Sequence, residues 1–381
     1  MKFVAKTLYG LEQVLAEELI NMGAGEVQAV NRAVLFRGNK ELLYRVNYCS
    51  RTALSVLMNI SDFRIRSKED LYDGSLRIEW ERYMGPDDTF SVAPVVNSVY
   101  FPHTGYAGLI LKDAVADYFR KKTGRRPSVN PGNPDILINL HVSNDQASVS
   151  LDSSVIPLFK RGYRQDQTTA PLNEVLAAGI LMISGWNGSE TLIDPMCGSG
   201  TFPVEAGLIS CNIPPGKFRK FFGFERWKDF EAGLFDKIKE EAEKRIVPSP
   251  VKIYGSDILP EAARLAVANV SRAGLEAIVS IDVADFKDLK ARDENGFVFL
   301  NPPYGQRLQP EETDALYGMI GTTLKHGFQG NTAWLITSNK ESLKNVGLKA
   351  KVKRTLYNGA LECTLLKYEM YQGSKKIIHD I

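Results

Sequence analysis

The chain has 381 residues, of which 44% are hydrophobic and 24% are charged, as in ordinary globular proteins. This length allows two or three domains with cores of their own. The formal net charge is only +2, so the overall charge gives no sign of a nucleic-acid partner, and any surface that binds nucleic acid must be a local patch.

Several classes of protein are disfavoured by the remaining composition. The N-terminal residues MKFVAKTLYGLEQ contain no apolar signal-peptide region, and no apolar run approaches the roughly 20 residues that span a bilayer. The four cysteines form no CxxC pair and the four histidines are dispersed, which predicts no metal site. We therefore expect a cytoplasmic protein with no membrane partner.

The N-terminal half predicts two small α/β segments. Hydrophobic periodicity first indicates a strand, a helix, a hairpin and a second helix, at residues 3–5, 8–20, 27–36 and 40–46. The following segment predicts strands at 54–60, 89–92, 135–142 and 147–151. It also predicts helices at 68–79 and 104–119.

Five cations follow the second of these helices within residues 120–126. Positive charge at a helix C-terminus complements the helix dipole, so the run could be a solvated helix end. It could also be a patch that contacts phosphates. The sequence leaves both interpretations open.

The C-terminal half predicts a longer α/β domain. A helix is expected from Pro171, because proline suits the first turn of a helix. The further helices are expected at 202–210, 235–245 and 260–273. The strands are expected at 191–193, 252–257, 279–286, 297–300, 332–338 and 360–368, the last two closing the sheet as an antiparallel pair.

Residues 211–250 form an insertion in which basic and aromatic residues alternate. Its cations and rings are Lys217, Arg219, Lys220, Phe221, Phe222, Phe224, Arg226, Trp227 and Lys228. Such a mixture suits phosphate contact combined with base stacking. The rings could equally form a small satellite core, and the pattern does not decide between the two.

A glycine-containing turn, DPMCGSGT at 194–201, lies between a predicted strand and a predicted helix. Glycine lets the backbone approach a ligand closely. No lysine follows Gly200, so the turn is not a phosphate-binding P-loop. An acid at Asp194 fits a cationic, non-phosphorylated nucleoside such as S-adenosylmethionine. A second acid, Asp257, ends the next strand, where a carboxylate can accept hydrogen bonds from ribose hydroxyls.

A second motif, NPPYG at 301–305, follows the apolar strand 297–300. Its two prolines exclude a helix and cannot continue a central strand. An amide, a rigid loop and an aromatic ring are thus expected at a strand's carboxyl end, where open α/β sheets bind their ligands.

Together, DPMCGSGT and NPPYG resemble the class I S-adenosylmethionine-dependent methyltransferases that modify exocyclic amino groups. The N-terminal half resembles a THUMP domain preceded by a ferredoxin-like module. The THUMP resemblance is carried by Tyr106, Ala107, Lys112, Asp113, Ala114, the run 124–127, the run 134–136 and His141.

Residues RGYR at 161–164 and APL at 170–172 narrow the resemblance to bacterial 23S rRNA guanine-N2 methyltransferases with a THUMP domain. The resemblance covers essentially the whole chain. It departs at Phe159, where histidine is expected, and at Asn173, where lysine or another polar residue is expected. Relatives are sometimes fused to a second methyltransferase domain, for which we expect no room in 381 residues.

This resemblance implies an α/β protein with three domains. They are a ferredoxin-like module at 1–52, a THUMP RNA-binding domain at 53–155, and a Rossmann-like class I methyltransferase domain at 156–381 with a seven-stranded mixed sheet. It implies S-adenosylmethionine as cofactor and RNA as partner, with 23S rRNA preferred over tRNA. It implies no metal.

The motifs, the basic runs and the resemblance together assign residues to expected roles. The expected catalytic residues, which position the target amine and its base, are Asn301, Pro302, Pro303 and Tyr304. The expected cofactor-binding residues are Ala170, Pro171, Leu172, Asp194, Met196, Cys197, Gly198, Ser199, Gly200, Thr201, Asp257, Ile258, Asp285 and Phe286. The expected RNA-binding residues are Lys121, Lys122, Arg125, Arg126, Lys160, Arg161, Arg164, Lys217, Arg219, Lys220 and Arg307.

Other functions remain open. The same proline-rich loop could hold an adenine amine for N6 methylation or a protein glutamine, although the THUMP-like half disfavours DNA and protein substrates. A tRNA guanine-N2 methyltransferase is the nearest alternative. An RNA-binding protein with a vestigial methyltransferase domain is disfavoured, because the motif residues are intact.

Overall fold

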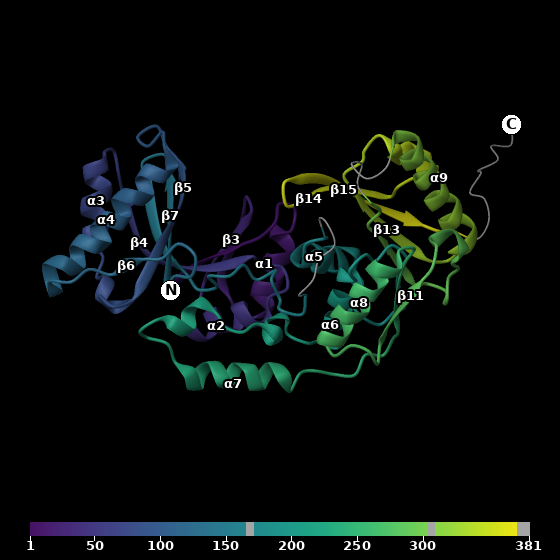
Figure 1. The fold of residues 1–381 in the computed structure, drawn as a ribbon, viewed down its shortest axis with the longest axis horizontal. Helices are drawn as coiled ribbons and strands as arrows, with labels where there is room; N and C mark the ends of the chain where they lie inside the picture. Colours follow the sequence, from purple (N-terminus) through teal and green to yellow (C-terminus); the bar gives the residue numbers. More distant parts are fainter. Residues whose placement is uncertain (165–170, 304–308, 372–381) are drawn as a thin grey trace. The chain divides into compact units, whose positions relative to one another are not determined.

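The computed structural model describes residues 1–164, 171–303 and 309–371 (Figure 1). The chain divides into two compact units. The first comprises Met1–Thr7, Leu15–Lys160 and Arg219–Ala242, and the second comprises Leu8–Val14, Arg161–Phe218 and Glu243–Ile381. Among the described residues, no helix combines the length and the apolar character that a membrane crossing requires.

The first unit is built on one eight-stranded sheet of order β2-β3-β1-β4-β8-β7-β5-β6. Strand β4 pairs antiparallel with both β1 and β8, so the ferredoxin-like and THUMP-like segments share one continuous sheet. The strands are β1 Lys2–Lys6, β2 Gly25–Val30, β3 Ala33–Arg37, β4 Ser55–Arg64, β5 Thr89–Asn97, β6 Ser128–Val129, β7 Ile136–Ser143 and β8 Gln146–Asp152. The main helices are α1 Glu12–Asn21, α2 Lys40–Cys49, α3 Lys68–Leu76 and α4 Thr104–Thr123.

These elements follow the predicted order with two differences. Helix α3 ends at Leu76 and is followed by a separate 3-10 turn, η1 Trp80–Arg82, where the sequence predicts one helix to residue 79. Strand β6 was not predicted, because two residues paired with β5 are too short to show a period.

Four buried aromatic residues of the 211–250 segment belong to the core of the first unit. Phe222, Phe224 and Trp227 are buried, together with Phe235 of α7 (Ala232–Glu243). The ring of Phe224 stacks on that of Tyr44 in α2, with centroids 4.3 Å apart. These buried rings are unavailable for base stacking, so the alternative of a core is the correct one. The core is continuous with that of the sheet and is no satellite.

The second unit contains a sheet with the expected seven strands, and their order is β11-β10-β9-β12-β13-β15-β14. Strand β15 is antiparallel to both of its neighbours, and the other pairs are parallel, which gives the expected mixed sheet. The strands are β9 Leu192–Asp194, β10 Ile253–Asp257, β11 Val279–Val283, β12 Phe297–Leu300, β13 Thr332–Thr337, β14 Val352–Asn358 and β15 Leu361–Glu369.

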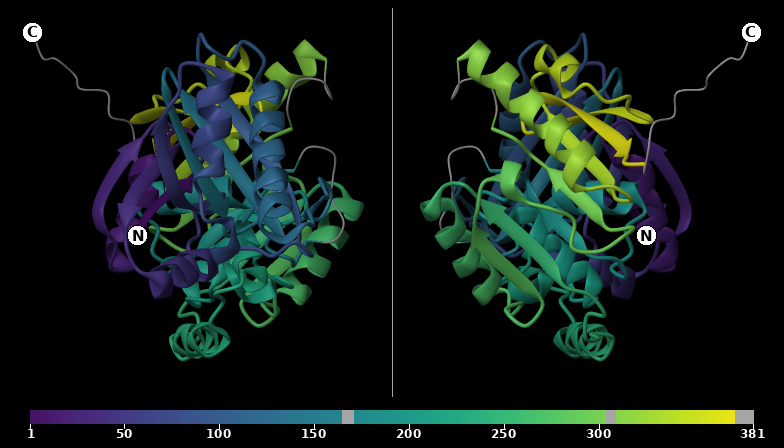
Figure 2. Two further views of the ribbon diagram at one scale, coloured as in Figure 1. Left: turned by 90° about the vertical axis from the view of Figure 1, so that its left-hand side faces the viewer. Right: turned by 90° about the vertical axis from the view of Figure 1, so that its right-hand side faces the viewer.

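Helices cover both faces of this sheet. They are α5 Glu174–Ser184, α6 Thr201–Ser210, α8 Pro260–Arg272 and α9 Pro310–Gly327. Side chains alternate along β12: Phe299 packs on Phe202 of α6, whereas Val298 joins the buried cluster that contains Ile320 of α9. Figure 2, in its right-hand panel, shows α9 lying across the strands.

Three elements of this unit differ from the sequence-based expectation. Helix α5 does not begin at Pro171 but at Glu174. Asn173 caps it, because its side chain accepts hydrogen bonds from the backbone N–H of Val175 at 2.9 Å and Leu176 at 3.3 Å. Helix α9 and strand β14 were not predicted.

Candidate active site

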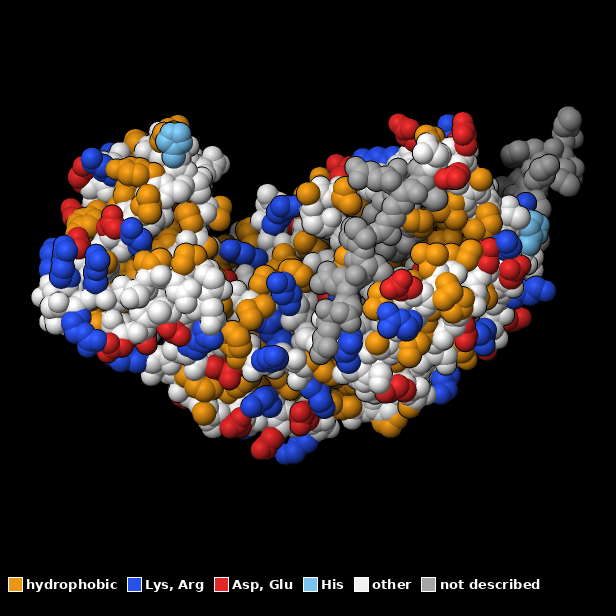
Figure 3. Space-filling view, in the orientation of Figure 1, with side chains coloured by type: hydrophobic (Ala, Val, Ile, Leu, Met, Phe, Trp, Pro, Cys, Tyr) orange, Lys and Arg blue, Asp and Glu red, His pale blue; other side chains and the backbone are white. Residues whose placement is uncertain are grey.

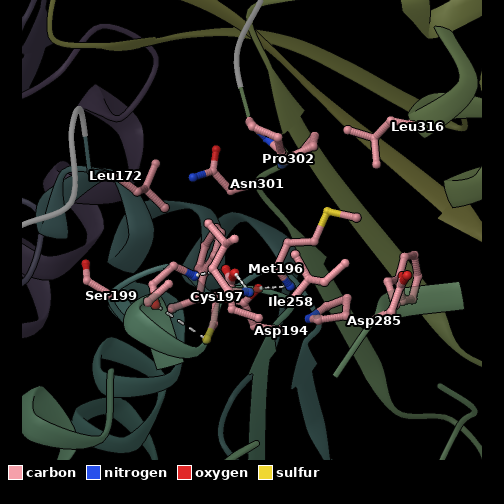
Figure 4. Close-up of a pocket in the computed structure, with 18 of the residues that line it drawn as sticks. Leu172, Asp194, Met196, Cys197, Ser199, Ile258, Asp285, Asn301, Pro302 and Leu316 are labelled. Carbon is pink, nitrogen blue, oxygen red and sulfur yellow. Dashed lines mark hydrogen bonds between the residues drawn. The ribbon is translucent and has the colours of Figure 1, made fainter. Parts of the chain in front are cut away.

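A cavity of about 1010 Å³ lies at the carboxyl ends of β9, β10, β11 and β12 (Figure 4). Parallel strands place these ends at one edge, so residues far apart in the sequence meet there. The predicted residues that line it are Pro171, Leu172, Asp194, Met196, Cys197, Gly198, Ser199, Thr201, Asp257, Ile258, Asp285, Phe286, Asn301, Pro302 and Pro303. Ala170 and Tyr304, also predicted here, lie outside the described residues.

The glycine turn connects β9 to α6 and forms one wall of the cavity. Gly198 has a φ of +54°, and a Cβ at this position would meet nothing within 4 Å, so its bare backbone leaves room on the cavity side. Its N–H donates to Asp257 Oδ2 at 2.9 Å. Gly200 does not line the cavity: its φ is +81° and a Cβ would come 3.0 Å from Ala266, so it permits close packing of α6 against α8.

The carboxyl of Asp194 is buried at the end of β9, where its Oδ1 accepts a hydrogen bond from the N–H of Met196 at 3.3 Å. Burial, and secondarily the neighbouring Asp257, raise the pKa of Asp194 well above its ordinary value. A cation in the cavity would favour the ionised form. Buried Cys197 is unsuited to nucleophilic chemistry, because burial first and then the two carboxylates raise the pKa of its thiol.

Asp257 and Ile258 shape the next side of the cavity. Asp257 Oδ1 accepts from the N–H of Leu259 at 2.9 Å, which fixes the carboxylate at the end of β10. Ile258 is 61% exposed although apolar, and Figure 4 shows it at the cavity wall. An exposed apolar side chain beside a fixed carboxylate suits a ligand with both a flat ring and hydroxyl groups.

Asp285 and Phe286 follow β11. Asp285 caps the short helix η4 (Phe286–Asp288) and pairs with Lys287 at 2.8 Å, which lowers the pKa of the Asp285 carboxyl. The ring of Phe286 is buried against Phe328, with centroids 5.5 Å apart.

Asn301, Pro302 and Pro303 begin directly after β12. Asn301 is half-buried and Pro302 is buried. Figure 4 shows the Asn301 amide and the Met196 thioether projecting into the same cavity, between Leu172 on one side and Leu316 on the other. The amide-bearing loop and the acidic, glycine-rich wall thus form one site.

Part of the lining was not anticipated from the sequence. It comes from α9, from the residue that follows β13 and from the start of β15. The residues are Glu312, Ala315, Leu316, Met319, Ser338 and Leu361. Pro310 followed by Leu316, Met319 and Ile320 is a helical spacing that could have revealed α9. The position of its cavity-facing side, however, depends on tertiary packing.

Two of the predicted RNA-binding cations are buried, and the structure contradicts that role. The Arg161 guanidinium pairs with Glu205 of α6 at 3.4 Å, both side chains being at most 1% exposed. The Arg164 side chain is 6% exposed and pairs with Glu174 at 3.4 Å. Buried and paired guanidinium groups cannot contact phosphates on the surface.

Arg219 was also predicted to bind RNA, but its side chain contacts the protein backbone. Its guanidinium donates to the backbone carbonyls of Ile156, Pro157 and Lys160 at 2.8–2.9 Å, so it holds the chain in place.

Lys122 and Arg125 pair with Glu81 and Asp87, respectively.

The other predicted RNA-binding residues are at the surface. Lys217 pairs weakly with Glu243 at 3.8 Å. The exposed members are Lys121, Lys122, Arg125, Arg126, Lys160, Lys217 and Lys220. Figure 3 shows basic side chains grouped at the end of α4, with acidic ones among them. Arg307 lies outside the described residues. Within the described residues, no three His, Cys, Asp or Glu side chains are grouped to hold a metal ion.

The sheet order and the loops at its carboxyl edge define the class I methyltransferase fold. Residues 161–367 match the family described as RMKL-like, methyltransferase domain. Residues 66–152 match the THUMP domain, and residues 2–57 match the RlmL ferredoxin-like domain. The chain belongs to the RMKL-like methyltransferase family.

Known relatives cover nearly the whole chain. A ribosomal RNA large subunit methyltransferase K/L of Methylococcus capsulatus is 39% identical, covering 97% of this chain and 51% of the relative. A Synechocystis protein named as a candidate RNA methyltransferase is 37% identical over 97% of both chains. The crystal structure of a candidate methyltransferase complexed with SAH is similar, with a TM-score of 0.88, 32% identity, and coverage of 98% and 99%. The chain spans about half the length of several curated relatives that it matches.

Proposed function

We propose that the protein transfers a methyl group from S-adenosylmethionine to the exocyclic N2 of a guanine in RNA, with 23S rRNA as the substrate. The observation that carries this proposal is the meeting of two motifs in one cavity. The Asn301–Pro303 loop, which can hold an amine, opens onto the same space as the Asp194–Gly198–Asp257 wall.

The residues of the wall fit the cofactor chemically. Gly198 leaves backbone space, Asp257 offers a fixed carboxylate for ribose hydroxyls, and Ile258 offers an apolar surface for adenine. Buried Asp194 suits a positively charged ligand, because ionising it needs a compensating charge. When bound, S-adenosylmethionine supplies an electrophilic methyl group on its sulfonium.

The remaining chemistry is positioning. The lone pair of the guanine N2 amine is delocalised into the ring, so the amine is a weak nucleophile. The side-chain oxygen of Asn301 and the backbone carbonyl of Pro302 can accept hydrogen bonds from the two N–H groups of the amine and so orient the lone pair toward the methyl group. Holding the reacting atoms at about 3–3.5 Å then lowers the barrier without a strong base. As the N–C bond forms, the C–S bond breaks and leaves a neutral thioether, and the methylated nitrogen then releases one proton to water. Tyr304 is proposed to stack on the base.

RNA as the substrate is supported by the THUMP match and by the names of the relatives. We propose that Lys121, Lys122, Arg125 and Arg126, at the end of α4, provide phosphate contacts, together with Lys160, Lys217 and Lys220. A ribosomal RNA substrate agrees with the expected cytoplasmic location. We retain 1–52, 53–155 and 156–381 as the proposed domains.

The substrate class can be tested by offering labelled S-adenosylmethionine with protein-free 23S rRNA, total tRNA or duplex DNA. Label entering 23S rRNA preferentially is the expected result. Preferential labelling of tRNA would retain the chemistry and refute the proposed substrate. Labelling of DNA would refute the assignment to RNA.

A further inference from the structure

Arg164 lies behind the wall of the cavity and contacts two other parts of the chain, residues 172–174 and the start of α6. Its guanidinium donates to the backbone carbonyl of Leu172 at 3.4 Å through both terminal nitrogens. It also donates to the hydroxyl of Thr201, the first residue of α6. Its third partner is the carboxylate of Glu174, in the first turn of α5, at 3.4 Å.

Two of these partners belong to the cavity wall. Leu172 and Thr201 both line it, whereas Arg164 and Glu174 do not. Leu172 precedes α5 in a segment without regular structure, so its position depends on tertiary contacts. The carbonyl of Pro171 accepts from the Asn358 side chain at 3.4 Å, and the Asn173 N–H donates to the same side chain at 3.1 Å. Through its hydrogen bonds to Leu172 and Thr201, the Arg164 guanidinium anchors the Pro171–Leu172 segment to the start of α6, on the glycine-turn side of the cavity.

Arg161 provides an internal comparison, because it lies in the same segment and is also buried and paired with a glutamate. Its partner Glu205 is in α6, and Tyr163 donates its hydroxyl to the same carboxylate at 3.0 Å. None of these three side chains lines the cavity. The two arginines are thus alike in burial and pairing but differ in whether they reach the cavity wall.

We propose that Arg164 is a positioning residue for the cofactor: it holds the Pro171–Leu172 segment against the start of α6 and so closes one side of the cofactor site. This inference rests on the proposed function, since it takes the ligand of the cavity to be S-adenosylmethionine or its product. The planar guanidinium reaches several acceptors in fixed directions, which the single ammonium of lysine cannot do.

The test compares R164K with R161K in the whole 381-residue chain. Both changes keep the charge and remove the planar fork, so each should lower the melting temperature to a similar extent. The measurement is calorimetric binding of S-adenosylhomocysteine in the absence of RNA. R164K should bind about tenfold to a hundredfold more weakly than the wild type, the range expected for losing a charge-assisted hydrogen bond, whereas R161K should bind within about twofold.

Turnover gives a second measurement. R164K should raise the KM for S-adenosylmethionine much more than it lowers kcat, so that saturating cofactor restores most of the activity. Unchanged binding by R164K, or equal weakening in R164K and R161K, would overturn the positioning role while the wild type still binds. Failure of the wild-type protein to bind would instead refute the proposed cofactor and, with it, this inference. Should R164K not fold, E174Q weakens the same anchor from outside the cavity and should also weaken binding, and unchanged binding in E174Q would then overturn the role.

Discussion

Replacing Asn301 by alanine should separate catalysis from cofactor binding. Asn301 follows β12 directly and is half-buried in the cavity, whereas the proposed cofactor-binding residues Asp194, Gly198 and Asp257 lie on other strands and turns. The substitution removes one of the two proposed amine acceptors and leaves the backbone carbonyl of Pro302 in place. Losing one such preorganised group typically lowers kcat by about 10²–10³, or about 2.7–4 kcal/mol.

The assay is single-turnover methyl transfer to RNA with labelled cofactor, combined with calorimetric binding of S-adenosylhomocysteine. The alanine variant should bind within a few-fold of the wild type and turn over two to three orders of magnitude more slowly, as roughly estimated above. Asn301→Asp is the matched control, because it keeps an acceptor oxygen at the same place and should retain more activity than alanine. Unchanged turnover in Asn301→Ala would refute the amine-positioning role.

Three further predictions follow from the site and the core. Because the pKa of Asp194 is raised in the free protein and a cationic ligand favours its ionised form, cofactor affinity should fall as the pH is lowered through that pKa; Asp194→Asn should bind weakly and lose this dependence, and an unchanged pH profile in that variant would contradict the role. Gly198→Ala places a methyl group on the cavity side of a residue with φ of +54°, so binding of S-adenosylhomocysteine should weaken measurably, and wild-type affinity would show that the ligand does not approach this backbone. Phe224→Ala should lower the free energy of unfolding in urea by about 3–5 kcal/mol, whereas a loss below about 1 kcal/mol would contradict its place in the core.

The sheet and the cavity wall could be predicted because their signals are local. Strands β9 and β12 contain short apolar runs and end in Asp194 and Leu300, β10 ends in Asp257, and parallel strands bring such ends to one edge. Asp285 follows β11 by two residues and reaches the same edge. Asp194, Asp257, Asp285 and Asn301 therefore line one cavity, as the sequence predicts.

The roles of the charged and aromatic residues depend on partners that the sequence does not connect. Arg161 resembles a surface cation until Glu205 is brought against it by the packing of α6. Phe224 resembles a stacking residue until α2 supplies Tyr44. Burial makes Arg161 and Phe224 structural residues, and the local composition of the sequence does not show that they are buried. Glu312 and Leu316 reach the cavity for the same reason, through the placement of α9.

The central claim, methylation of an exocyclic guanine amine, is tested most directly by identifying the modified nucleoside. RNA methylated with labelled S-adenosylmethionine would be digested to nucleosides. The nucleosides would be separated by chromatography and identified by mass spectrometry against standards. The prediction is label in N2-methylguanosine, lost in Asn301→Ala. Label in N6-methyladenosine or in another nucleoside would contradict the proposed base and atom.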